Sequence, residues 1–153
     1  MASKKLRVWL IAGGTVVLLL AIFIIRYLAV PLVAEDNYSK RGSVAYYVTI
    51  KSATIKNFPL VKLVEPEEYY SSSGDGPKLP ANGVIYLSNE DPNTLMDTAV
   101  SYLVGRGFDK DDSQCGNSEC TFSKKGSTVE LRITPHAGDT QQVKCTEYFD
   151  VGR

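Results

Sequence analysis

The chain has 153 residues, and its 17 basic and 17 acidic side chains give a formal charge of zero. Residues 1–34 carry four basic residues and no acid, whereas residues 35–153 carry 13 basic and 17 acidic residues, a net charge of −4. Nucleic acids and anionic lipid headgroups both require a basic footprint. Composition therefore argues against both as ligands of residues 35–153, although a local basic patch would override this bias.

The first predicted element is an apolar helix. Residues 8–25 read VWLIAGGTVVLLLAIFII and contain no charge. A helix of this length rises roughly 27 Å, which is close to the roughly 30 Å hydrocarbon core of a bilayer. Trp9 and Tyr27 stand at its two ends, where aromatic residues favour the headgroup region, and Arg26 can extend its charge outward. We therefore expect a transmembrane helix over residues 8–30, with these three residues as its interfacial anchors.

The charges beside this helix predict its orientation. Lys4, Lys5 and Arg7 precede it without an acid, which places residues 1–7 in the cytoplasm as a short tail. The expected location is the cell membrane, crossed once, with the C-terminal domain outside the cytoplasm. The alternative is a signal peptide cleaved near Ala34, although Leu32 occupies a position where signal peptides favour a small residue. Retention of the helix is the favoured interpretation, and the bilayer is then one partner.

Residues 31–42 are expected to form a tether, and residues 43–150 one extracytoplasmic domain. Within the domain, residues 43–50 alternate apolar and polar positions, which is typical of a strand. Residues 59–66 and 83–88 predict a second and a third strand. The Ser-, Gly- and Pro-rich residues 71–83 predict a flexible loop.

One helix and three further strands follow in the sequence. Asp91 is a suitable N-cap and Pro92 a suitable first helical residue, and an apolar face at helical spacing predicts a helix that ends near Gly105. Residues 119–124 and 127–135 flank a Lys-Gly turn, and residues 141–149 complete a β-β-β-α-β-β-β order. This order predicts an antiparallel-rich α+β domain with the helix covering one face of the sheet. The strand-helix-strand step also allows one parallel pair.

Three cysteines leave several pairings open. The turn places Cys120 opposite Leu131, and the last strand then places Cys145 on the other side of Leu131. Two strands separate those cysteines by roughly 9–10 Å, which exceeds the limit of about 7 Å between bridged α-carbons. We therefore favour a Cys115–Cys120 disulfide with Cys145 as a buried thiol, while a Cys115–Cys145 bridge and the absence of any bridge stay open.

Catalytic, metal and cofactor sites lack the necessary residue patterns. A zinc site would need a second pair of ligands besides the one C-x₄-C pair, and this spacing is not the C-x-x-C of redox motifs. His136 and Asp139 lie close in sequence but have no accompanying nucleophile. The acidic residues 109–112 do not match a calcium loop. We expect no catalysis, no metal, no cofactor and no small-molecule substrate.

Two tyrosine pairs are the candidate interaction residues. Tyr46-Tyr47 and Tyr69-Tyr70 each place neighbours on opposite faces of a strand, so one tyrosine of each pair is expected to face outward. Exposed tyrosines are frequent contact residues. We interpret these four residues as a possible interaction surface, the alternative being ordinary packing at the rim of the sheet.

No motif is specific enough to place the chain in a family. The leading hypothesis is a single-pass, membrane-anchored accessory or interaction protein of the cell envelope, without catalysis, whose partner is another envelope or membrane protein. The alternative is a secreted binding or inhibitor domain released by cleavage near Ala34. A hydrolase or redox enzyme built on His136 or the cysteines is the least favoured hypothesis.

Overall fold

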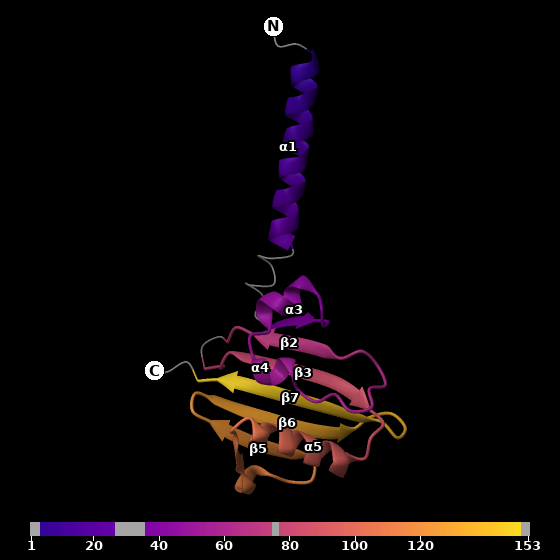
Figure 1. Cartoon of the computed structure of the whole chain (residues 1–153), viewed down its shortest axis with the longest axis vertical. Helices are drawn as coiled ribbons and strands as arrows, with labels where there is room; N and C mark the ends of the chain where they lie inside the picture. The colour runs from indigo at the N-terminus through magenta and orange to yellow at the C-terminus, as the bar shows by residue number, and fades with distance from the viewer. Residues whose placement is uncertain (1–3, 27–35, 75–76, 151–153) are drawn as a thin grey trace.

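The structure is a computed structural model that describes residues 4–26, 36–74 and 77–150. It is a mixed α+β architecture that consists of a long N-terminal helix, α1 (Lys4–Ile24), and a sheet domain, as Figure 1 shows. In the described part of the chain, the structure contains no helix that is both long and apolar enough to cross a membrane.

A seven-stranded sheet organises the domain. The strands are β1 (Asp36–Ser39), β2 (Glu68–Ser72), β3 (Ala81–Ser88), β4 (Asp109–Asp111), β5 (Glu119–Lys124), β6 (Ser127–Pro135) and β7 (Gln141–Phe149). Their order in space is β1-β2-β3-β7-β6-β5-β4, and every pair between neighbouring described strands is antiparallel. The strands β1 and β4 therefore form the two opposite edges of the sheet.

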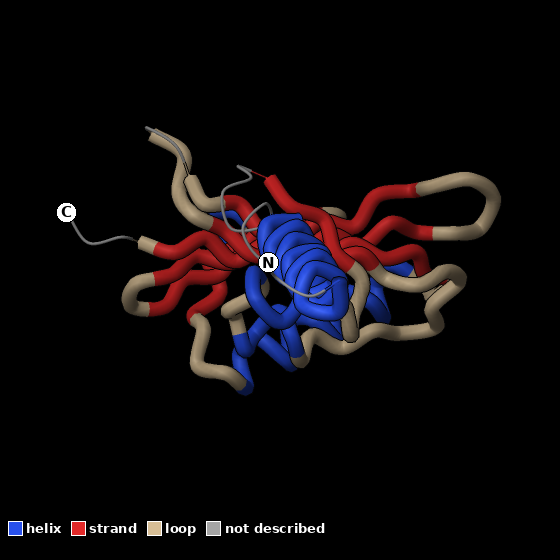
Figure 2. Tube along the Cα trace, turned by 90° about the horizontal axis from the view of Figure 1, so that it is seen from above, coloured by secondary structure: helices blue, strands red, loops and turns tan. Residues whose placement is uncertain are grey.

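The helices of the domain cover one face of this sheet, as Figures 1 and 2 show. They are α3 (Val44–Thr49), α4 (Ala53–Lys56) and α5 (Pro92–Gly105). Helix α5 connects β3, the third strand from the β1 edge, to β4 at the opposite edge of the sheet. The parallel pair that the strand-helix-strand step allowed does not form between the described strands, because the chain returns at the edge and runs back through antiparallel neighbours.

The C-terminal half matches the predicted elements closely. Helix α5 has Asp91 as its N-cap, whose side chain accepts hydrogen bonds from the two backbone N–H groups of Asn93 and Thr94. The predicted apolar face of α5 packs on the core, and Phe108 is buried in the same cluster, with its backbone N–H donating to the carbonyl of Leu103. The predicted register is also confirmed, with Cys120 and Cys145 flanking Leu131 on opposite sides.

The strand predicted for residues 43–50 is wrong, since these residues form α3. The Ser43 side chain accepts a hydrogen bond from the backbone N–H of Tyr46 and caps the helix. The buried residues are Tyr46 and Ile50, four positions apart, so burial follows a helical period rather than a period of two. The alternation of the sequence did not distinguish the two structures over so short a segment.

The strand predicted for residues 59–66 is also not formed. Only an isolated bridge joins Leu63 to Ser88, and the segment otherwise runs as a bent loop beside the end of β3. The structure instead adds three short strands, β1, β2 and β4, that the sequence did not predict. Strand β1 lies within the expected tether. The predicted 71–83 loop is shorter than expected, because β2 includes its first two residues and β3 its last three, so that residues 73–80 connect the two strands.

A buried polar network joins the α3–α4 junction to the sheet. The amide oxygen of Asn82 accepts hydrogen bonds from the backbone N–H groups of Lys51 (2.7 Å) and Ser52 (2.9 Å). The Ser52 hydroxyl accepts a bond from the N–H of Ile55 (2.8 Å) and donates to the carboxylate of Glu147. Asn82 and Glu147 face each other across β3 and β7 and are both buried. The first turn of α4 is therefore held by side chains of two central strands.

Replacing Asn82 with alanine tests this network. The Asn82→Ala variant leaves the N–H groups of Lys51 and Ser52 without their acceptor, and we expect a loss of about 2–4 kcal/mol in the free energy of unfolding. Urea unfolding followed by circular dichroism measures it. The control is Asn93→Ala on the exposed first turn of α5, which should change stability by less than about 0.5 kcal/mol. Equal effects of the two variants would contradict the role assigned to Asn82.

Candidate functional site

A disulfide closes the loop between β4 and β5. Cys115 and Cys120 are bonded, with 4.0 Å between their α-carbons, as the sequence favoured. Inside the loop, the N–H of Gly116 donates to the carbonyl of Glu119 (2.8 Å), and the carbonyl of Ser118 accepts a bond from the N–H of Ile133 on β6 (2.7 Å). The loop is thus closed on itself and bonded to the sheet.

A polar groove lies between this loop and the sheet face opposite the helices, which we call the outer face. Its volume is about 790 Å³. The walls come from residues 113–116 and 118–121, and five polar residues line it from β6 and β7: Glu130, Arg132, Lys144, Thr146 and Tyr148. These five side chains alternate in sequence with the buried core residues of the same strands, so the outer face is the polar side of the pleat.

The charges in the groove are mixed in sign. Arg132 pairs with Glu119 (3.2 Å), and the hydroxyl of Tyr148 donates to Glu130 (3.3 Å). The Arg132–Glu119 pair is more than half exposed and contributes little to stability. Lys144 has its ammonium over the Tyr70 ring, 5.3 Å from the centroid. The groove therefore offers hydrogen-bond donors and acceptors together, which suits a polar peptide segment better than an apolar molecule or a polyanion.

One row of residues crosses the outer face from edge to edge. The strand registers place one residue from each strand in this row: Tyr38, Tyr70, Gly83, Thr146, Glu130, Thr121 and Asp111. The Tyr70 ring lies where a side chain at Gly83 would stand, and its hydroxyl is hydrogen-bonded to Thr146. Tyr38 is 63% exposed, with its ring centroid 6.0 Å from that of Tyr70. Two tyrosines thus lead from the β1 edge toward the groove.

The four tyrosines predicted as one surface do not form one. Tyr46 and Tyr69 are core residues whose rings meet edge to face at 4.8 Å, so they are not available for contact. Tyr47 is 64% exposed on α3, while Tyr70 is half-buried on the outer face. The predicted alternation within each pair is present, but the exposed members belong to different surfaces. Tyr38 was missed, because its partner strand β2 was not recognised.

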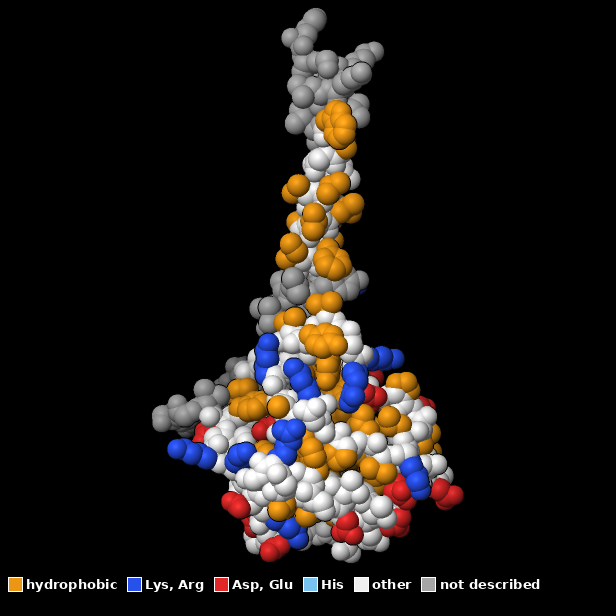
Figure 3. All heavy atoms as spheres, viewed as in Figure 1, with side chains coloured by type: hydrophobic (Ala, Val, Ile, Leu, Met, Phe, Trp, Pro, Cys, Tyr) orange, Lys and Arg blue, Asp and Glu red, His pale blue; other side chains and the backbone are white. Residues whose placement is uncertain are grey.

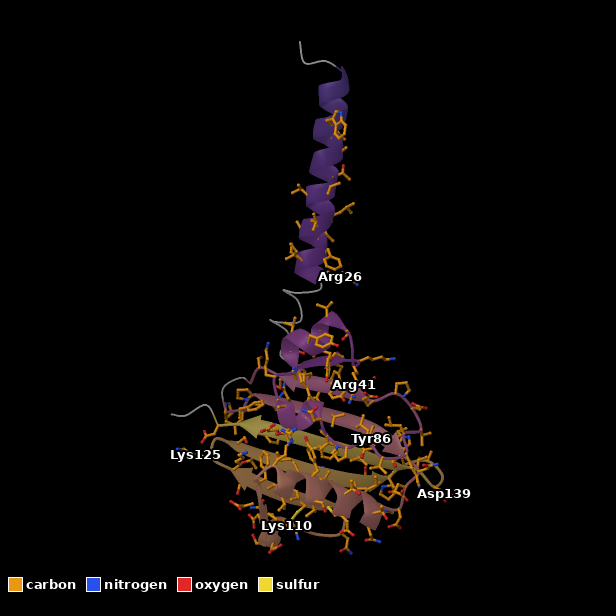
Figure 4. The ribbon with its side chains drawn as sticks, in the orientation of Figure 1. Arg26, Arg41, Tyr86, Lys110, Lys125 and Asp139 are labelled. Atoms are coloured by element: carbon orange, nitrogen blue, oxygen red, sulfur yellow. A yellow bond between two sulfur atoms is a disulfide. The ribbon has the colours of Figure 1, made fainter. Side chains whose placement is uncertain are left out.

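The remaining candidates are dispersed in the structure. His136 is exposed in the β6–β7 turn, where its backbone N–H donates to the carbonyl of Thr140 (2.9 Å), and Asp139 is also exposed. Among the described residues, no group of three metal-binding side chains comes together. In the expected anchor, Trp9 is 77% exposed and Arg26 is exposed at the end of the helix (Figure 4), while Tyr27 lies outside the described residues.

Known protein families, curated proteins and solved structures show no significant match to this chain.

The cysteines give a direct chemical prediction. Cys145 is fully buried, and burial raises the pKa of its thiol well above the usual range. Iodoacetamide should therefore modify no cysteine of the folded protein, one cysteine in denaturant and three in denaturant after reduction. Intact-mass spectrometry counts the adducts. Two adducts or more in denaturant without reduction would show that the Cys115–Cys120 bond is absent.

The buried phenols predict a loss of stability in alkali. Burial raises the pKa of Tyr70 above its ordinary value of 10.0 and raises the pKa of Tyr86 to about 12. The unfolded chain therefore releases these protons first, and stability that is present below pH 10 falls between pH 10 and about 12.

The Tyr70→Phe variant isolates one of these phenols. It loses the hydrogen bond to Thr146 at every pH, so its stability is lower at neutral pH, but its decline above pH 10 should be shallower than that of the natural protein. Urea midpoints between pH 8 and pH 11.5 measure the two slopes. Parallel slopes would contradict the assignment to Tyr70.

Proposed function

We propose that this chain is a non-catalytic interaction protein, anchored in the cell membrane by its apolar residues 8–30, whose sheet domain lies outside the cytoplasm and contacts another envelope or membrane protein. The observation that carries the proposal is the exposure of apolar side chains along α1. Eleven large apolar side chains from Trp9 to Ile25 are between 49% and 77% exposed: Trp9, Ile11, Val16, Val17, Leu18, Leu19, Leu20, Ile22, Phe23, Ile24 and Ile25.

Such exposure is unfavourable in water. Burying one large aliphatic or aromatic side chain contributes about 1.5–3 kcal/mol, and contiguous exposed apolar surface of this extent marks a membrane or protein contact. Figure 3 shows apolar atoms along the visible face of α1. The uncharged run in the sequence also includes Val8 and Leu10, whose side chains lie outside the described part of the chain. We propose lipid as the environment of this segment.

The disulfide and the N-terminal charges support the orientation. A Cys115–Cys120 bond persists in oxidising compartments and is rare in the cytoplasm. Lys4, Lys5 and Arg7 precede the apolar run, and basic residues flank membrane helices preferentially on the cytoplasmic side. Both observations favour a cytoplasmic N-terminus and an external sheet domain.

The outer-face groove supports a contact with another protein. It combines Lys144, Glu130 and the hydroxyl of Tyr148 around a hollow large enough for several residues of a peptide. The proposal involves no catalysis, since the described residues that line the groove include no histidine, and the two cysteines among them form the disulfide. The role proposed for the groove is recognition through hydrogen bonds and complementary charges.

Membrane fractionation tests the anchor. The full-length protein should remain in the membrane fraction after alkaline carbonate extraction, with the intact mass of the complete chain. Leu18→Arg together with Leu19→Arg should release it, because each arginine at the centre of a membrane helix costs about 2.5–3.5 kcal/mol. The control places two arginines at Asn93 and Ser101 on the exposed side of α5. Recovery in the supernatant, or a mature chain that begins near Glu35, would contradict anchoring and support a secreted domain.

Photo-cross-linking in native membranes tests the groove. A photoreactive amino acid at Tyr148, which lines the groove, should yield a discrete higher-mass product, whereas the same residue at Asn93 on the helical side should not. The absence of a product at Tyr148, or the same product at both positions, would contradict the groove as the contact.

A further inference from the structure

The acidic character of the domain conceals a basic segment. Residues 37–64 contain five basic residues, Lys40, Arg41, Lys51, Lys56 and Lys62, and no acidic residue. Residues 65–153 contain eight basic and 15 acidic residues, a net charge of −7. The local basic patch that composition alone left open is therefore present, and six residues, which include Glu35 and Asp36, separate it from the expected anchor in sequence.

The first part of this segment lies at one edge of the domain, because it includes most of the edge strand β1 and the helix α3 that contacts it. Helix α4 then packs over the central strands β3 and β7. On the face shown in Figure 3, Lys and Arg atoms dominate the half of the domain that carries α3, and Asp and Glu atoms dominate the opposite half. Figure 4 places Arg41 at the end of the domain that carries α3 and Lys110 at the opposite end.

Three of the five cations are not neutralised by a neighbour. Arg41 pairs with Glu67 (2.8 Å), and Lys62 pairs with Glu90 (2.9 Å). In the described part of the chain, Lys40, Lys51 and Lys56 have no carboxylate within salt-bridge distance. Their charges are thus available to an external anion.

Two exposed apolar side chains belong to the same segment. Val44 is 44% exposed and Tyr47 is 64% exposed, both on α3. An aromatic ring with a polar tip and flanking lysines is the combination that favours a membrane–water interface. We define the basic pole as Lys40, Val44, Tyr47, Lys51 and Lys56.

We propose that the basic pole docks on the anionic lipid headgroups of the bilayer that holds α1. This inference rests on the membrane anchor proposed above. Eleven residues separate Ile24 from Asp36, and a chain of that length reaches at most about 40 Å. The domain therefore stays near the lipid surface, where charge attracts the basic pole and repels the acidic remainder, so the domain adopts one orientation.

A fluorescent label on α3 tests the docking. The full-length Val44→Cys protein carries one reactive thiol, because Cys145 is buried and the other cysteines are bonded. It is labelled with the polarity-sensitive dye NBD and reconstituted in vesicles of phosphatidylcholine alone, or of phosphatidylcholine with phosphatidylglycerol. We expect the emission to shift to the blue and to brighten several-fold only with phosphatidylglycerol, and high salt to reverse the change. Lys110→Cys on β4, at the opposite edge, is the control and should not respond.

Charge variants test whether the lysines of the basic pole, and not the net charge of the domain, cause the response. Lys40→Gln, Lys51→Gln and Lys56→Gln together should abolish the response of the label at residue 44. Lys110→Gln, Lys124→Gln and Lys125→Gln remove the same charge at the opposite half of the sheet and should leave it intact. An equal response in both lipids that salt does not screen would overturn the proposal, as would an equal response to soluble heparin without vesicles.

Flotation of the same samples distinguishes the two proposals. Protein that does not float with either type of vesicle contradicts the anchor and the docking together. Protein that floats with both types, while the label at residue 44 stays in a watery environment, leaves the anchor in place and overturns the docking alone.

Discussion

The arrangement of the domain depends on the hydrogen bonds that Asn82 makes under α3 and α4. A buried backbone N–H without an acceptor is costly, and the chain between these helices exposes the N–H groups of Lys51 and Ser52 to the core side of the sheet. The Asn82 amide oxygen on β3 accepts both of these N–H groups, and the Glu147 carboxylate on β7 accepts a hydrogen bond from the Ser52 hydroxyl. These bonds keep the α3–α4 segment, and with it the basic residues at its ends, at one side of the sheet.

The pleat of the same strands produces two surfaces of different chemistry. On β6, Val129, Leu131 and Ile133 are buried under α5, while Glu130 and Arg132 stand on the outer face. Each antiparallel register fixes which residues become neighbours on both faces at once. The register that places Cys145 beside Leu131 on the core face therefore also determines the row on the outer face that runs from Tyr38 to Asp111. The disulfide loop stands beside one part of that row, and the groove lies between the loop and the sheet.

Sequence patterns predicted the C-terminal half because its signals are local and strong. An N-cap followed by proline, a Lys-Gly turn and two long alternating strands leave few alternatives, and their register excluded a bridge between Cys120 and Cys145. The N-terminal half lacked such signals. Strand β1 has four residues, β2 has five with polar ends, and α3 has alternating residues whose helical conformation depends on the Ser43 cap. The groove was not predicted, since its residues are polar strand positions that become neighbours only through long-range pairing.

The two proposed contacts are compatible because they lie on different parts of the sheet. Strand β1 is one edge of the sheet, and α3 contacts it. The groove is lined by residues of β5, β6 and β7 and of the loop before β5, which lie closer to the opposite edge. A domain resting on lipid through Lys40, Lys51 and Lys56 keeps its acidic strands and the groove away from the anionic surface. The charge separation along the sequence then has a physical reason: attraction at one edge and repulsion at the other present the groove to a partner in the envelope.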